Sequence, residues 1–131
     1  MLIAIDPQSD VPVYRQLMEQ VKFLIASGQL LPGDELPSTR TLSAELGVNP
    51  MTISKAYSYL ERENVLERRP GRPLVVKAFT AEQLRVRKVD LLRQGLAPAA
   101  TMARHLGFDA GEALAIFRQM LERATEEEGL G

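Results

Sequence analysis

Cysteine is absent from the 131 residues, and histidine occurs once, as His105. The missing cysteine excludes disulfide bonds, thiolate zinc sites and cysteine nucleophiles, and it is compatible with a reducing cytoplasm, where we expect the protein to work. A single histidine excludes a metal centre built from several imidazoles and a Cys–His catalytic pair. We therefore predict no metal site and no cofactor.

Long apolar runs are also missing. No run approaches the roughly 20 residues that a membrane helix requires, and the opening "MLIAIDPQSD" lacks the basic start of a signal peptide. A phosphate-binding glycine loop comes directly after a strand and leads into a helix. Neither of the glycine-containing stretches "PGRP" and "LGFDAG" has this position. His105 falls inside a helical pattern without a nucleophile-elbow motif. The sequence thus predicts neither a membrane protein nor an enzyme, and no catalytic residue.

The composition, with 45% apolar and 25% charged residues, is that of a globular protein. The length of 131 residues suits one domain with a small accessory piece. The net charge of −1 conceals an uneven distribution. Acids gather in the "EEE" at 126–128, whereas between residues 68 and 88 Glu82 is the one acid among seven basic residues: Arg68, Arg69, Arg72, Lys77, Arg85, Arg87 and Lys88.

The first 60 residues carry the pattern of a short strand and three helices. "LIAI" (2–5) resembles a small strand that ends at Asp-Pro. A helix then begins near Pro12 and ends at Gly28, and its apolar stripe includes Leu17, Val21 and Leu24. A turn-rich connector, "LLPGDELP" (30–37), leads to a second helix that we expect to be capped by Ser38 and ended by Gly47.

The third helix begins at Asn49 and Pro50, because asparagine caps a helix and the fixed φ of proline suits the first helical position. Its apolar residues recur at helical spacing (Ile53, Ala56, Tyr57 and Leu60). Two strands follow, over 66–69 and 74–79, joined by the turn "PGRP".

From Thr80 onward only helical patterns occur. We expect one helix capped by Thr80 and ended by Gly95, a shorter one ended by Gly107, and a longer one that begins near Asp109. The predicted fold is therefore mainly α, an α+β winged helix-turn-helix over residues 1–79 followed by a small all-helical dimerisation module over 80–131.

In a winged helix-turn-helix, the third helix enters the major groove and the strand pair lies along the adjacent DNA backbone or minor groove. An ordinary three-helix core would give a similar apolar pattern. The basic turn "RRPGRP" favours the DNA-binding alternative, because Arg69 and Arg72 can pair with phosphates.

The segment "PVYRQLMEQVKFLIASGQLLPGDELPSTRTLSAELGVNPMTISKAYSYLERENVLERRPGRP" resembles the DNA-binding domain of the GntR family of bacterial transcription regulators. The matching parts are the opening Pro-x-Tyr, the connector "GQLLPGDELPS", "LGV" and "LER". "NPMTISKAY" and the short helical tail resemble the YtrA subfamily. The resemblance implies DNA contacts from the start of the second helix, the start of the third helix and the wing tip: Ser38, Arg40, Asn49, Met51, Thr52, Ser54, Lys55, Arg69, Gly71 and Arg72.

Alternatives remain open for several of these residues. Arg40 could pair with Glu45, Met51 could be a surface methionine without a base partner, and Lys55 could contact phosphate without reading a base. Tyr59 lies off the apolar stripe and could reach a phosphate or a neighbouring subunit. The wing of family members often reads Gly-x-Gly-Thr, whereas Pro73 replaces a flexible position of that motif in this chain. The wing could therefore be stiffer here, which leaves its minor-groove contact open.

The helical tail carries more apolar residues than some 50 residues can cover within one subunit. We expect them to form a homodimer interface: Leu84, Leu91, Leu92, Leu114, Phe117 and Leu121. The resemblance implies a repressor that binds double-stranded DNA at a palindromic operator and controls a transporter operon and its own gene. The tail of about 50 residues is too short for a roomy pocket within one subunit, so a small-molecule effector of unknown identity could bind only between subunits or between the two modules. The alternative is a winged helix that contacts only other proteins.

Overall fold

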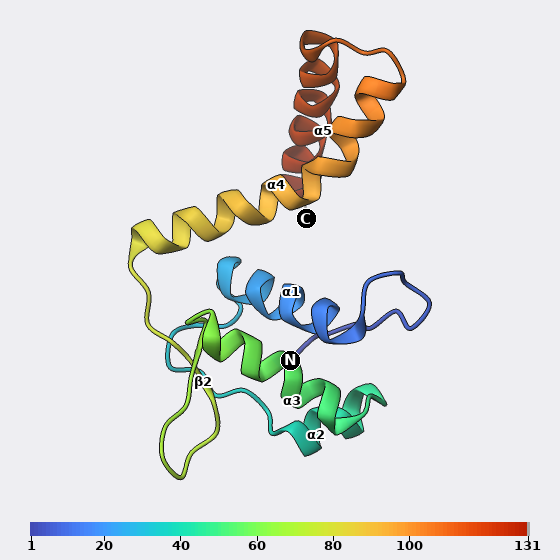
Figure 1. The fold of residues 1–131 in the computed structure, drawn as a ribbon. Helices are drawn as coiled ribbons and strands as arrows, with labels where there is room; N and C mark the ends of the chain where they lie inside the picture. The colour runs from blue at the N-terminus through green and yellow to red at the C-terminus, as the bar shows by residue number, and fades with distance from the viewer. Residues whose placement is uncertain (131) are drawn as a thin grey trace. The chain divides into compact units, whose positions relative to one another are not determined.

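The computed structural model describes residues 1–130, and the chain divides into two compact units, Met1–Lys88 and Val89–Gly131. We describe each unit by itself. The division falls inside a helix, after the Thr80 boundary that the sequence suggested. The elements in chain order are α1 (Val13–Ala26), α2 (Thr39–Leu46), α3 (Pro50–Arg62), β1 (Leu66–Glu67), β2 (Val75–Val76), α4 (Ala81–His105) and α5 (Ala110–Leu130) (Figure 1).

The first unit is a winged helix, as predicted. β1 and β2 pair antiparallel with Leu66 opposite Val76, and the connector before α2 adds a third extended segment through a bridge between Glu35 and Val75. The strands are shorter than the predicted 66–69 and 74–79. Pro70 and Pro73 lie between them and have no N–H to donate, which limits the ladder to the base of the hairpin.

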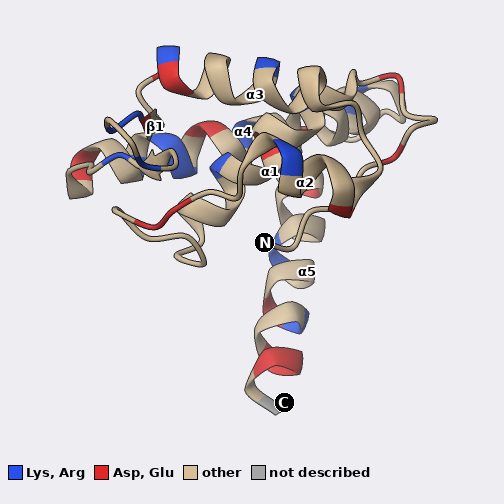
Figure 2. Ribbon diagram, turned by 90° about the horizontal axis from the view of Figure 1, so that it is seen from below, with Lys and Arg blue, Asp and Glu red and all other residues tan. Residues whose placement is uncertain are grey.

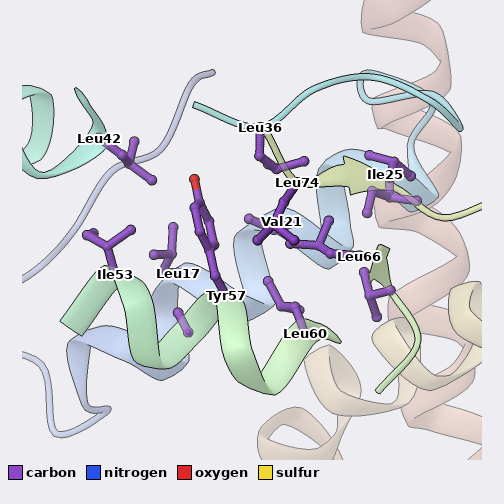
Figure 3. Packing of buried hydrophobic residues seen from close by; sticks show 13 residues of the cluster. Leu17, Val21, Ile25, Leu36, Leu42, Ile53, Tyr57, Leu60, Leu66 and Leu74 are labelled. Atoms are coloured by element: carbon purple, nitrogen blue, oxygen red, sulfur yellow. The ribbon is translucent and has the colours of Figure 1, made fainter. Parts of the chain in front are cut away.

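The core of the first unit lies between α1, α2, α3, the connector and the strand pair (Figure 3). The apolar residues of α1 and α3 recur at helical spacing, so each helix turns one apolar face toward the core. Side chains of the other elements pack against these faces and are also excluded from solvent. The largest fully buried side chains are Leu17, Val21, Ile25, Leu42, Ile53, Leu60, Leu66 and Val76.

The helix starts follow the predicted caps. The Ser38 hydroxyl accepts from the Thr41 backbone N–H at 3.0 Å. The Asn49 side chain accepts from the Met51 N–H at 2.8 Å, and Pro50 is the first residue of α3. Gly47 adopts a φ of 66°, a left-handed conformation that favours glycine and ends α2.

The predicted strand over residues 2–5 is wrong. Instead, the segment is held to α1 by two glutamines one helical turn apart: the Gln20 side chain exchanges hydrogen bonds with the backbone of Ala4 (2.9 and 2.6 Å), and that of Gln16 does the same with Asp6 (2.9 Å each). These amides supply the donor and acceptor that a neighbouring strand would offer, and no other strand lies beside the segment among the described residues.

The prediction that a helix ends at Gly95 is also wrong, because α4 continues through Gly95 and Pro98 to His105. A glycine inside a helix costs about 1 kcal/mol. A proline costs about 3 kcal/mol, because it removes one hydrogen bond and its ring clashes with the carbonyl four residues earlier, but it can kink a helix without ending it. Thr80 does cap α4, accepting from the Gln83 N–H at 3.1 Å.

The second unit consists of the remainder of α4 and α5. Asp109 caps α5 by accepting from the Glu112 N–H at 2.8 Å, and this bond lowers the pKa of the Asp109 carboxyl. None of residues 89–129 is buried. Within the described part of the chain, no helix has both the length and the apolar character that crossing a membrane requires.

Candidate nucleic-acid interface

The start of α3 presents a polar face. Ile53 is fully buried, whereas Met51 is 79% exposed and Ser54 and Lys55 are exposed. Thr52 is partly buried beside them. The helix therefore faces its core with one side and leaves small, polar and cationic side chains on the other, which is the arrangement that reading a major groove requires.

Two tyrosines lie beside this face. The Lys55 ammonium lies 4.1 Å from the centre of the Tyr14 ring, a cation–π contact, and the Tyr14 and Tyr59 ring centres are 5.6 Å apart. Arg62 lies 5.6 Å from the Tyr59 ring. Tyr59, for which the sequence left a phosphate or a subunit contact open, thus packs against α1, and Tyr14 orients Lys55.

Arg40 lies in the first turn of α2 and is exposed. Within residues 1–130 its side chain forms no ion pair or hydrogen bond, so the alternative pairing with Glu45 is not formed. The guanidinium is available for an external anion. Ser38 differs, because its hydroxyl donates to Thr41 Oγ1 at 2.9 Å in addition to capping the helix.

Tyr57 fixes α2 relative to α3. Its ring lies in the core, and its hydroxyl donates to the Pro37 carbonyl at 2.8 Å, directly before the cap of α2. Burial, with a smaller contribution from the charge of Glu45, raises the pKa of the Tyr57 phenol. The bond holds the start of α2, and with it Arg40, at a fixed place beside α3.

The wing tip is a tight turn. The Arg72 N–H donates to the Arg69 carbonyl at 3.1 Å, and Gly71 has a φ of 68°, which side chains rarely allow. Arg72 is exposed. The Arg69 guanidinium lies 3.8 Å from the Glu67 carboxylate, at the limit of an ion pair.

The basic cluster of residues 68–88 is divided in space. Arg68 pairs with Glu61 at 2.9 Å, and Lys77 and Arg87 both bond to Asn64. In Figure 2, where the ribbon is coloured by charge, basic and acidic segments are interspersed along the chain. Within residues 1–130, three members of the cluster form no hydrogen bond or ion pair through their side chains: Arg72, Arg85 and Lys88.

The residues predicted for dimerisation keep much of their surface exposed. Leu84, Leu91 and Phe117 are partly buried. The others expose more than half of their surface: Leu92 (56%), Leu114 (65%) and Leu121 (52%).

The chain is similar to known regulators. Residues 13–76 match the profile of the bacterial regulatory proteins of the gntR family. The HTH-type transcriptional repressor YtrA of Bacillus subtilis is 36% identical over 108 residues, which are 82% of this chain and 83% of the relative. YtrA from Sulfolobus acidocaldarius, a GntR-family transcription factor of known structure, is 42% identical with a TM-score of 0.58, covering 74% of this chain and 99% of that one.

A DNA complex is also among the similar structures. The DNA-binding domain of AraR bound to its operator ORX1 is 29% identical with a TM-score of 0.50, over 56% of this chain and 92% of that one. The similarity to a known repressor, the match to the family profile and the winged-helix fold all indicate the same family. This chain belongs to the GntR family of bacterial regulatory proteins.

Proposed function

We propose that this protein is a dimeric repressor that binds a palindromic operator and blocks a promoter. Sequence-specific DNA binding and transcription regulation, without catalysis, follow from membership in the GntR family. The observation that carries the finer proposal is the start of α3, where Met51, Ser54 and Lys55 are exposed opposite a fully buried Ile53.

The DNA contacts divide into three groups. Thr52, together with the exposed Met51, Ser54 and Lys55, would reach base edges in the major groove, where each good base contact contributes about 1–3 kcal/mol of discrimination. Ser38, Arg40 and Asn49, at the starts of α2 and α3, would meet the flanking backbone. Arg69, Gly71 and Arg72 would lie against the adjacent minor groove or phosphates, where cations supply affinity for any sequence.

The second unit would supply the dimer. A two-fold pair places two recognition helices about 34 Å apart, which is one turn of DNA, so the operator should be palindromic. The exposed apolar residues of α4 and α5 support this proposal, since a second copy can cover what one subunit leaves open. The targets we propose, by similarity to YtrA, are a transporter operon and the protein's own gene, regulated in the cytoplasm.

The test is selection of bound sequences from a random DNA pool by the full chain. We expect enrichment of one palindrome, together with binding that weakens steeply as salt rises. Enrichment of no sequence, with equally weak binding to every duplex, would contradict the proposal and favour the alternative of a winged helix that contacts only proteins.

A further inference from the structure

A pocket of about 540 Å³ lies in the first unit, away from the start of α3 and the wing tip. Its lining comes from the turn after α3, the chain just after β2 and the first two turns of α4. The volume is within the roughly 300–1,000 Å³ of small-molecule sites. None of the DNA contacts proposed above uses it.

Arg87 is the unusual residue of this pocket. One guanidinium nitrogen, Nη2, donates to the Asn64 carbonyl at 3.3 Å, and the group lies 5.4 Å from the Phe79 ring centre. The other nitrogen, Nη1, exposes less than 1 Å² and has no hydrogen-bond partner among the described residues. A buried, charged N–H group without an acceptor is costly and is rare in folded proteins, so an acceptor is expected at this place.

A second cation lies in the same lining. The Lys77 ammonium donates to the Asn64 side-chain oxygen at 3.2 Å, so both cations are bonded to neutral oxygens of one residue. Of the two acids that line the pocket, Glu63 is already paired with Lys22 at 2.9 Å. Glu82 is therefore left to balance two cations, and the pocket can accept one further negative charge.

We propose that this pocket binds a small organic monocarboxylate. Its two oxygens would meet the planar fork of Arg87, which suits a carboxylate, and the Lys77 ammonium, while its hydrocarbon part lies on Val86 and Ala78. The proposal requires the guanidinium to turn about its last side-chain bonds, so that Nη1 faces the pocket. A phosphate dianion is disfavoured, because its second charge would be repelled by Glu82.

Binding would join the first turns of α4 to the turn at Asn64, since Arg87 belongs to the helix and Lys77 to the segment after β2. The ligand would thereby stabilise the point at which α4 leaves the winged helix. Slower hydrogen exchange over residues 82–87 would accompany occupancy.

The experiment is a titration of the full ¹⁵N-labelled chain with sodium butyrate, with sodium chloride and sodium phosphate at equal ionic strength as the other arms. We expect saturable shifts of the Arg87 side-chain N–H and of the Asn64 amide with a Kd in the millimolar range, as suits so small a ligand. Phosphate should bind at least about tenfold more weakly at these residues.

Arg87→Met should lower butyrate affinity about tenfold or more, and Arg85→Met, on the exposed side of the same helix, should leave it unchanged within about twofold. If Arg87→Met does not fold, Lys77→Gln should lower the affinity in its place. The proposal fails if butyrate shifts these signals no more than chloride does. It also fails if Arg87→Met and Lys77→Gln both fold and bind butyrate as tightly as the natural chain does. Tighter binding of phosphate than of butyrate would likewise overturn the proposal, because it would indicate a DNA-backbone contact.

Discussion

The two units of this chain use apolar residues in opposite ways. In the first unit every buried residue lies between Leu17 and Val76, and together they form one core under α1, α3 and the strand pair. In the second unit no residue between 89 and 129 is buried, although leucine, methionine and phenylalanine recur along both helices. We therefore propose that the first unit can fold alone and that the exposed apolar residues of the second unit meet a partner.

The largest expected effect is the difference in unfolding free energy when leucine is replaced by alanine in each of the two units. Leu60→Ala removes a fully buried side chain and should cost about 2–5 kcal/mol of unfolding free energy. Leu114→Ala, at a side chain that is 65% exposed, should change the unfolding of the first unit by no more than about 0.5 kcal/mol. Urea denaturation followed by circular dichroism measures both. Equal costs would contradict the division.

The wing tip offers the next test, because we expect a substitution there to change DNA binding and to leave the packing of the core unchanged. Gly71→Glu places a carboxylate where we propose the wing meets phosphates, and like-charge contact should cost several kcal/mol of operator affinity. Gly71→Ala is the matched control, since it brings the same backbone strain at a φ of 68° without the charge. We expect both to melt at similar temperatures and only the glutamate variant to lose operator binding. Equal binding by the two would remove the wing tip from the interface.

Arg40 should show a smaller effect. Because its guanidinium has no partner within residues 1–130, Arg40→Ala should leave stability unchanged and weaken operator binding by about 1–3 kcal/mol if a base is read. A phosphate contact alone should instead weaken binding to every duplex and reduce the salt dependence. Arg104→Ala, an exposed cation of the second unit, is the control for net charge. Fluorescence anisotropy on selected and scrambled duplexes distinguishes the outcomes, and full affinity in Arg40→Ala would exclude this residue.

Local chemistry explains why much of the first unit could be predicted from the sequence. Caps such as Ser38 and Asn49, and the apolar spacing of α3, act over a few residues, and the structure has them as predicted. The contacts at residues 2–6 and at Arg87 could not be predicted, because they join segments distant in sequence: Gln20 reaches Ala4, and Arg87 reaches Asn64. Likewise, the sequence showed seven nearby cations but not which of them are paired: Arg68 pairs with Glu61, and Lys77 and Arg87 bond to Asn64.

The continuous α4 has a different lesson. Gly95 and Pro98 cost a helix interior about 1 and about 3 kcal/mol, respectively, yet α4 runs through both. The proposed DNA contacts remain predictions at the level of single residues, since partner identity is not encoded in the spacing of Met51, Thr52 and Ser54. The orientation of Lys55 by Tyr14 had a signal in the sequence, the Pro-x-Tyr opening, but nothing there paired it with α3.

The smallest effect concerns the joint between α2 and α3. Burial raises the pKa of the Tyr57 phenol, so as pH rises through about 10 the unfolded chain loses this proton first. The stability that depends on the neutral phenol is thus fully present below pH 10 and is lost above it. Tyr57→Phe should cost about 1 kcal/mol at neutral pH, through the bond to Pro37, and should lose less stability between pH 9 and 11. Parallel pH profiles in urea denaturation would contradict this.

The most direct test of the division between a DNA-reading unit and an assembling unit is sedimentation of charge-matched variants, combined with operator titration. Leu92→Glu/Leu114→Glu replaces two exposed leucines of α4 and α5, and Gln94→Glu/Gln119→Glu adds the same charge at exposed polar positions of the same helices. We expect the natural chain and the glutamine variant to sediment as dimers. The leucine variant should be a folded monomer that binds a full palindrome about 10²–10⁴-fold more weakly. A natural chain that stays monomeric at micromolar concentration, or a leucine variant that keeps both the dimer and the affinity, would contradict the account.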